Sequence, residues 1–320
     1  MKPGDVSKCL WGLVLGWGWC FPALAQAPDT VKVGVYITSL YDFNLAENAY
    51  NADLWVWFNY QNDSLTPLET MEVVNLKEGD FSLVFYEKKG GVNWGTHKGK
   101  LKLKKQWDIR HFPFDKQDLE IIIEEANYDI SLLRYVPDLQ NSKIDRNVKL
   151  EGWAIRDFVL HNEVVTYETT YGDPTLKGKS NYARLRVNIR IARQAFGLFL
   201  KLFTGVYIAF AITLIIFFVS PESVEARFGL TVGSLFAAVG NKYIVDSILP
   251  ETTTFTLVDK VHTFTFLFIF LSLITSIVAL SLSLRGHKKA AALTDWAAFW
   301  FILLSYIIIN CWLVYAALAS

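Results

Sequence analysis

Hydrophobic positions follow two different patterns along this chain, and the change between them falls near residue 194. Between Val31 and Ala192, apolar and polar residues alternate in short runs. The clearest run puts Leu54, Val56, Phe58 and Tyr60 on one face, against Asp53, Trp55, Trp57 and Asn59 on the other. A period of two predicts β-strands, and further strands are predicted at 81–87, 119–125, 153–161 and 184–191. Short strands separated by turn signals such as Lys89-Gly90-Gly91 predict an all-β sandwich or barrel.

The last third of the chain instead contains four strongly apolar segments, at about 198–219, 228–249, 257–284 and 293–318. Each is long enough to cross a bilayer as a helix, which needs about 20 residues. The second segment carries Asn241, Lys242 and Asp246, and polar residues at membrane depth normally face protein or water instead of lipid. We therefore expect an all-β domain over residues 26–193 and a four-helix transmembrane domain over residues 194–320.

The first residues have the composition of a secretory signal peptide. Lys2 and Lys8 precede an apolar run from 9 to 21, and small residues follow up to Ala27. We predict a signal peptide over residues 1–25, because this run is too short for a membrane helix. An exported β-domain makes the first span run inward. The basic segment 285–289 then lies in the cytoplasm, as the positive-inside rule requires, and the C-terminus returns to the exported side.

Composition adds mainly exclusions. Lysines and arginines balance aspartates and glutamates at 31 each, which gives no basic excess for nucleic acid. Of the three cysteines only Cys311 lies beyond the predicted signal peptide, inside an apolar segment. The exported domain therefore has no disulfide and no cysteine metal site. The five histidines are scattered, and no catalytic triad, phosphate-binding loop or paired metal motif is recognisable. We expect no enzyme, no cofactor and no metal site.

The segment Arg110-His111-Phe112-Pro113-Phe114-Asp115-Lys116-Gln117 carries a specific resemblance. Its Phe-Pro-Phe-Asp-x-Gln run resembles the signature loop of the pentameric ligand-gated ion channel family, the Cys-loop receptors and their bacterial relatives. Lys105 and Leu119 stand where animal members have cysteines, which fits the bacterial branch. The resemblance covers nearly all of the mature chain, including Arg193 before the first span and Leu249-Pro250 after the second. Departures are Gly205 where a proline is usual, Ala126 where an aromatic residue is expected, and no recognisable tryptophan-proline strand.

The resemblance implies a homopentamer in the bacterial inner (plasma) membrane, with the β-sandwich ligand-binding domain and the C-terminus in the periplasm. Its partners would be four identical subunits, membrane lipid and permeating monovalent cations, with no nucleic acid. The function implied is a ligand-gated ion channel. The alternative is a non-conducting, membrane-anchored receptor, but an anchor would not need an amphipathic, glycine-rich second helix with a carboxylate at its inner end.

One stripe of the second span is the predicted pore lining. At helical spacing it comprises Glu225, Gly229, Gly233, Phe236, Gly240, Tyr243 and Ser247. Five Glu225 carboxylates in a ring predict cation selectivity, and five Phe236 rings predict an apolar gate, with Tyr243 as a second constriction. Arg227, about 200° round the helix from Glu225, is expected to anchor at the cytoplasmic interface. The alternative for Gly229 and Gly233 is close packing between helices.

The resemblance also implies an agonist site between neighbouring β-domains, beneath a hairpin at about 168–179. The residues predicted to bind ligand are Glu124, Glu125, Tyr128, Tyr167, Tyr171, Tyr182, Trp55 and Trp57. A small amine, a proton and a divalent cation all remain open as effectors. The residues predicted to couple sensor and pore are Glu47, Phe112, Pro113, Phe114, Asp115, Arg193 and Pro250. We expect an Arg193–Asp115 ion pair with Glu47 as a further acidic contact; the alternative is an Arg193 that binds lipid headgroups.

Overall fold

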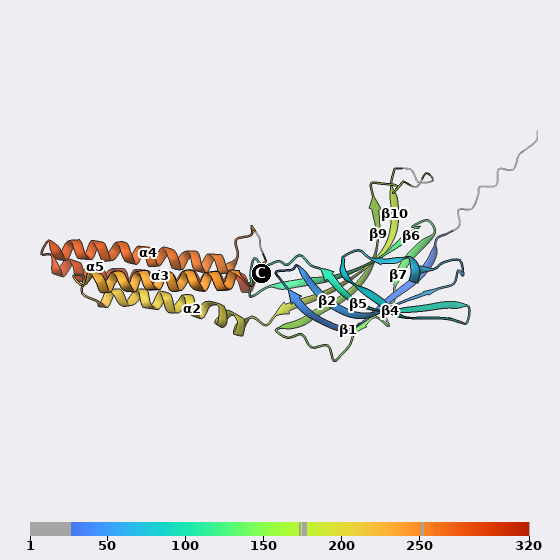
Figure 1. Ribbon diagram of the computed structural model, residues 1–320, viewed down its shortest axis with the longest axis horizontal. Coiled ribbons are helices and arrows are strands. Elements are labelled where there is room, and N and C mark those ends of the chain that lie inside the picture. Colours follow the sequence, from blue (N-terminus) through green and yellow to red (C-terminus); the bar gives the residue numbers. More distant parts are fainter. Residues whose placement is uncertain (1–26, 173, 175–177, 251–252, 320) are drawn as a thin grey trace, which may run out of the picture.

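A computed structural model describes residues 27–172, 174, 178–250 and 253–319. A β-sandwich and a bundle of long helices lie end to end along the longest axis of the molecule (Figure 1). The predicted signal peptide lies outside the described residues, as does the tip of the predicted ligand hairpin, including residues 173 and 175–177.

The sandwich consists of two sheets. The larger has the order β4-β5-β2-β1-β7, with β8 also pairing with β1, and the smaller has the order β3-β6-β10-β9. The larger sheet comprises β1 (Asp29–Asn44), β2 (Ala49–Tyr60), β4 (Leu76–Lys89), β5 (Val92–Lys104), β7 (Leu133–Pro137) and β8 (Lys143–Ile144). The smaller comprises β3 (Met71–Val73), β6 (Lys116–Asp129), β9 (Trp153–Tyr167) and β10 (Ser180–Arg193), and a short helix α1 (Pro67–Thr70) precedes β3. All strand predictions, and the all-β sandwich itself, are confirmed.

The alternation along β2 places its core face as expected. Leu54, Val56 and Phe58 are completely buried between the sheets, while Trp55 and Trp57 point outward and are only partly covered. The Trp57 ring lies flat over Gly34 of β1, so close that a Cβ added there would come within 2.3 Å of the ring. A glycine is needed at position 34 because any side chain would displace this tryptophan.

The helical part contains α2 (Ala195–Ile215), continued by a 3₁₀ turn η1 (Ile216–Phe218), then α3 (Val224–Asp246), α4 (Leu257–Leu284) and α5 (Lys288–Ala319). All four spans are long and apolar enough to cross a membrane, which confirms the prediction. Three helices begin earlier than predicted, α2 at 195, α3 at 224 and α5 at 288. In α3 and α5 the reason is a first turn with charged residues, which hydropathy does not detect. At the start of α4, Thr256 and Asp259 bond each other's backbone N–H as a capping box.

Candidate functional site

The predicted pore stripe lies on the face of α3 that the described residues leave open, with Ser247 just past the end of the helix. Each of its seven residues is exposed, and the two large side chains, Phe236 and Tyr243, are 72% and 78% exposed. The opposite face of the helix is buried against α2 and α4. Its buried residues are Arg227, Thr231, Ser234, Ala238 and Val245. The helix therefore presents a continuous unpartnered stripe with a carboxylate at one end.

The glycines of this stripe make no close contact with the part of the chain that the structure describes. A Cβ added at Gly229, Gly233 or Gly240 would meet nothing within 4 Å. Close packing against another described helix of the same subunit therefore does not explain why Gly229 and Gly233 are glycines. Each glycine costs about 1 kcal/mol of helix propensity relative to alanine, so the need for small residues must lie beyond the single chain.

Arg227 points away from the stripe as predicted, but its expected role as an interface anchor is wrong. Its guanidinium is buried and pairs with Asp295 of α5, with an N–O distance of 2.6 Å. It also donates to the backbone oxygen of Val219 in the α2–α3 connection, again at 2.6 Å. Asp295 was not singled out from the sequence, although a lone carboxylate in an apolar membrane helix is a recognised signal of a buried partner.

The other end of α3 holds the polar residues that hydropathy singled out. Lys242 pairs with Asp246 one turn on and with Asp259 of α4 at 2.8 Å. The Asn241 side-chain oxygen lies 2.9 Å from His262 Nε2, inside the bundle. Asn241 and Lys242 therefore have polar partners within the protein. This confirms for these two residues the expectation that they face protein instead of lipid.

The predicted Arg193–Asp115 pair is present at the junction of sandwich and bundle. Arg193 Nε donates to Asp115 Oδ1 at 2.7 Å and Nη2 donates to Oδ2 at 3.2 Å. Both side chains are largely buried, 10% and 2% exposed, so the headgroup-anchor alternative for Arg193 is wrong. The guanidinium also stacks on the Trp153 ring at 3.9 Å and lies 4.9 Å from the Phe112 ring.

The signature loop contacts two of the helices. Phe114 packs on Phe199 of α2 with ring centroids 5.5 Å apart, and the Arg110 backbone oxygen accepts a hydrogen bond from the Leu257 N–H at 3.0 Å. The Phe112-Pro113 peptide within the loop is cis. Pro250, after α3, shares a cavity of about 360 Å³ with the residues that lead into the loop. The loop thus lies between the last β-strand and the connection that follows α3.

Glu47 is placed at this junction but not with the partner we expected. It lies in the β1–β2 turn, which faces Ile248 just beyond α3. Its carboxylate pairs with Lys102 at 2.6 Å and more loosely with Lys77, instead of with Arg193. The Lys102 hydrogen bond lowers the pKa of Glu47. The expected Arg193 contact is wrong because neighbouring strands supply nearer cations.

Three of the predicted ligand residues come together on the outer face of the smaller sheet. The rings of Tyr167, Tyr171 and Tyr182 have centroids 5.6 to 6.5 Å apart. Glu124 lies beneath them and accepts a hydrogen bond from the Tyr167 hydroxyl at 2.8 Å. Partial burial and this carboxylate raise the pKa of Tyr167 to about 12, so the phenol stays protonated. Glu124 already forms an ion pair with Arg184 of β10, which we had not identified from the sequence.

The remaining predicted ligand residues lie elsewhere in the chain. Glu125 points into the sandwich, where Thr70 and Tyr135 donate to its carboxylate, so it is a buried structural acid. Tyr128 approaches the loop before α1. Trp55 and Trp57 lie on the outer face of the larger sheet, and Trp57 Nε1 donates to Asp138. The alternation of a strand forces Glu124 and Glu125 to opposite faces, a signal that was available in the sequence.

No protein-family model matches the chain. A curated relative named proton-gated ion channel, from Gloeobacter violaceus, is 22% identical over 292 residues, which are 85% of this chain and 78% of the relative. The gamma-aminobutyric acid receptor subunit rho-2 of Rattus norvegicus is 23% identical over 59% of this chain and 39% of its own length. The human subunit of the same name is 24% identical over 52% and 34%.

The four long apolar helices and these relatives support a multi-pass membrane protein with a β-sandwich domain, and the relatives are channels and receptor subunits, not enzymes. These relatives, together with the fold, indicate the pentameric ligand-gated ion channel family.

Proposed function

We propose that five copies of this chain surround a pore lined by the α3 stripe and that the pore conducts monovalent cations. The observation that carries the proposal is the open stripe itself, because a stripe with a carboxylate and three glycines suits a lumen or another subunit better than lipid chains. The β-sandwich and the C-terminus would lie in the periplasm and the basic 285–289 segment in the cytoplasm of a bacterial inner membrane.

Cation selectivity is assigned to Glu225. It lies in the first turn of α3 and is exposed on the stripe, while Arg227 is held on the opposite side by Asp295. Five such carboxylates around an axis would attract cations and repel anions at the narrow end of the pore. The Arg227–Asp295 pair supports this assignment because it fixes the rotation of α3 and keeps the nearby positive charge off the axis.

The first prediction tests this ring. Glu225→Gln should reduce the cation-to-anion permeability ratio because it removes one charge per subunit from the narrow mouth. The measurement is the reversal potential of reconstituted channels in asymmetric salt. Glu87→Gln, an exposed glutamate at the tip of the β4–β5 hairpin, is the matched control and should leave the ratio unchanged. An unaltered ratio in Glu225→Gln would refute the ring, and no current under any condition would favour the non-conducting receptor.

We assign a small organic cation to the tyrosine cluster as the effector. Three aromatic rings converge there, Tyr171 is largely exposed, and the faces of such rings attract cations. The Glu124 carboxylate is occupied by Arg184, so the rings would supply most of the attraction. The Trp55 face of a neighbouring subunit would close the site; Lys98 already lies 5.8 Å over that ring.

A proton is the second candidate effector, favoured by one feature of the smaller sheet and by the name of the Gloeobacter relative. Glu72 of β3 lies directly opposite Glu124 of β6. Partial burial and then the Glu124 charge raise the pKa of Glu72. As the pH falls, Glu72 therefore takes up a proton before an ordinary glutamate does, and the repulsion between the two carboxylates ends.

The second prediction separates the two effectors. If protons act through Glu72, Glu72→Gln should open the channel at higher pH than the wild type, because the glutamine imitates the protonated acid. Glu69→Gln, a nearby exposed glutamate, should not shift the pH response. Currents are recorded during pH steps without ligand and during an amine screen at neutral pH. Activation by an amine at constant pH that is lost in Tyr171→Ala supports the organic cation instead.

A further inference from the structure

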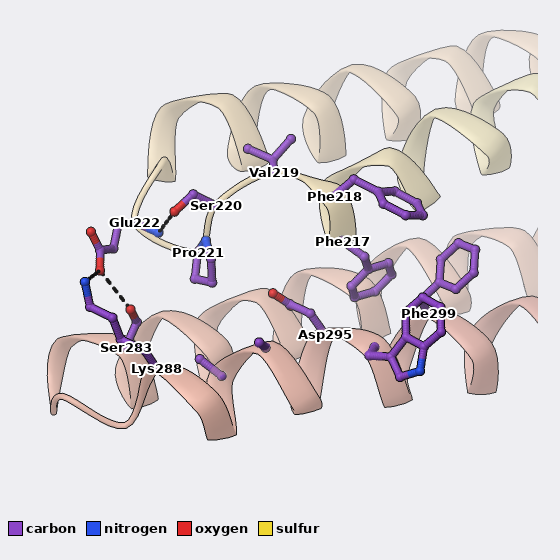
Figure 2. Close-up of a pocket in the computed structure, with 13 residues that line it drawn as sticks. Phe217, Phe218, Val219, Ser220, Pro221, Glu222, Ser283, Lys288, Asp295 and Phe299 are labelled. Carbon is purple, nitrogen blue, oxygen red and sulfur yellow. Dashed lines mark hydrogen bonds and ion pairs between the residues drawn. The ribbon is translucent and has the colours of Figure 1, made fainter.

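A cavity of about 430 Å³ lies at the end of the helix bundle remote from the β-sandwich. Its walls come from the α2–α3 connection on one side and from the last turn of α4 and the first turns of α5 on the other (Figure 2). A volume of this size falls within the range of small-molecule sites. The channel function assigned above does not use this cavity.

One wall of the cavity is aromatic. Phe299 of α5 is the centre of a cluster in which its ring centroid lies 5.1 Å from that of Phe218, 6.4 Å from that of Phe217 and 6.2 Å from that of Trp296. Phe218 and Trp296 are more than half exposed. Because all four helices are long enough to cross a membrane, these exposed rings would contact lipid chains. Aromatic rings with a polar edge are typical of the boundary between chains and headgroups.

The other wall is charged and lies at the level where the helices end. Glu222 accepts a hydrogen bond from Ser283 at 2.9 Å and pairs with Lys288 at 3.4 Å (Figure 2). These two partners lower the pKa of Glu222, which is therefore ionised at neutral pH. Lys288 is 76% exposed, so its ammonium can turn toward a ligand. Asp295 also borders the cavity, but its carboxylate is committed to Arg227.

The balance of charge selects the class of ligand. An anion alone would meet Lys288 but also two carboxylates, and a simple cation would leave Lys288 without a counter-charge once Glu222 is engaged. A zwitterion satisfies both groups, and the adjacent aromatic wall needs an apolar tail. We propose that this cavity binds the headgroup of a membrane phospholipid that carries a phosphate and a primary ammonium, from the leaflet remote from the β-sandwich.

In this arrangement the lipid ammonium donates to Glu222, the phosphate accepts from Lys288, and the acyl chains lie along Phe218 and Trp296. A primary ammonium suits the site better than a quaternary one because a carboxylate needs an N–H donor. The bound lipid would connect the α2–α3 connection to α5, next to the Arg227–Asp295 pair that holds α3. The inference rests only on the four helices crossing a membrane, so it stands or falls independently of ion conduction.

The test is native mass spectrometry of the full-length assembly. The protein in detergent is mixed with phospholipids that have identical acyl chains, and the lipids that remain bound after the detergent is removed are measured. Lipids with ethanolamine, choline and glycerol headgroups are compared, and the mass of each assembly shows that the variant has folded. We expect the ethanolamine lipid to be retained best. Lys288→Gln should weaken its retention by about threefold, the size expected for an exposed charge contact. Lys289→Gln, the adjacent lysine that does not border the cavity, should not.

A second matched pair tests the aromatic wall. Trp296→Leu should reduce retention of the ethanolamine lipid. Phe301→Leu, at another aromatic of α5 that is more than half exposed but lies outside the cavity, should leave it unchanged. Equal retention of all three headgroups would overturn the proposal. A second result would also overturn it: only the glycerol lipid is retained, and Lys288→Gln and Lys289→Gln weaken its retention equally. The basic segment would then act only as a positively charged surface for anionic lipid.

Discussion

Gly205 of α2 shows how one small residue lets α3 pack closely against its neighbour. A Cβ added at this glycine would come within 2.8 Å of the Asn241 side-chain amide, on α3. The same amide contacts His262 of α4, which is completely buried. The family usually has a proline at this position; here a glycine is needed because α3 comes close to α2 at Gly205. Through these contacts Asn241 connects α2, α3 and α4.

The third prediction follows from this contact. Gly205→Ala should push Asn241 away from His262 and leave a buried polar group without its partner, which costs about 1 to 3 kcal/mol. Gly197→Ala in the same helix is the matched control, since a Cβ there meets nothing within 4 Å and gains helix propensity. Thermal unfolding of the purified assembly should show a lower midpoint for Gly205→Ala and an unchanged or higher one for Gly197→Ala. Equal midpoints would show that Asn241 adapts without loss.

Charged residues show where prediction from sequence stops at this scale. The role of Arg193 could be predicted because the family resemblance places both Arg193 and Asp115 of the signature loop at the domain junction. The pair is present in the structure. The partners of Arg227 and Glu124, however, are 68 and 60 residues away in the chain. Nothing local specifies which charges meet across such distances, because strand register and helix packing decide it. Glu47 was wrongly assigned for the same reason.

At the scale of elements, periodicity was sufficient wherever one face is buried. The alternation in β2 predicted its core side, and the period of α3 predicted which side the rest of the chain would leave uncovered. Helix ends were predicted less well, since the first turns of α3 and α5 are polar. The ligand site was predicted only in part, because the tyrosines share one hairpin whereas Trp55 and Trp57 lie on the other sheet.

The fourth prediction concerns the middle of the pore helix. Phe236 is the only large side chain on the stripe between Glu225 and Tyr243, so five such rings would form the narrowest apolar ring. Phe236→Ser should wet this constriction, and the channel should leak without agonist or respond to less of it. Leu235→Ser, one residue earlier and about 100° round the helix, is the control. An assembled Phe236→Ser channel that stays closed and ignores agonist would place the gate elsewhere.

At the scale of the whole molecule, sandwich and bundle meet through few but specific contacts. The last strand β10 leads into α2 directly after Arg193, while the signature loop touches α2 through Phe114 and the start of α4 through Arg110. The turn between β1 and β2 faces the residues that follow α3. Among the described residues these elements join the two parts of the chain, so a change of shape in the β-sandwich would reach α3 through them.

The fifth prediction tests whether the Arg193–Asp115 pair transmits gating. Removing one partner of a buried pair typically costs about 3 to 5 kcal/mol, because the other charge is left uncompensated. Arg193→Gln and Asp115→Asn should therefore each disturb gating strongly, and the double variant should disturb it less than the sum. A double-mutant cycle on the free energy of opening, from agonist or pH dose–response curves, measures the coupling.

Arg190→Gln and Asp118→Asn form a matched cycle on β10 and β6, close to the first pair. That pair has a similar distance of 2.8 Å, but both side chains are more than half exposed. Its coupling should stay below about 1 kcal/mol. Both cycles change one arginine on β10 and one aspartate, which lies directly before β6 in the first pair and on β6 in the second. They therefore differ mainly in burial and in distance from the membrane helices. A buried pair that shows strict additivity would mean that Arg193 and Asp115 hold the junction together without transmitting the signal. The route from sensor to pore would then run through the Phe114–Phe199 contact instead.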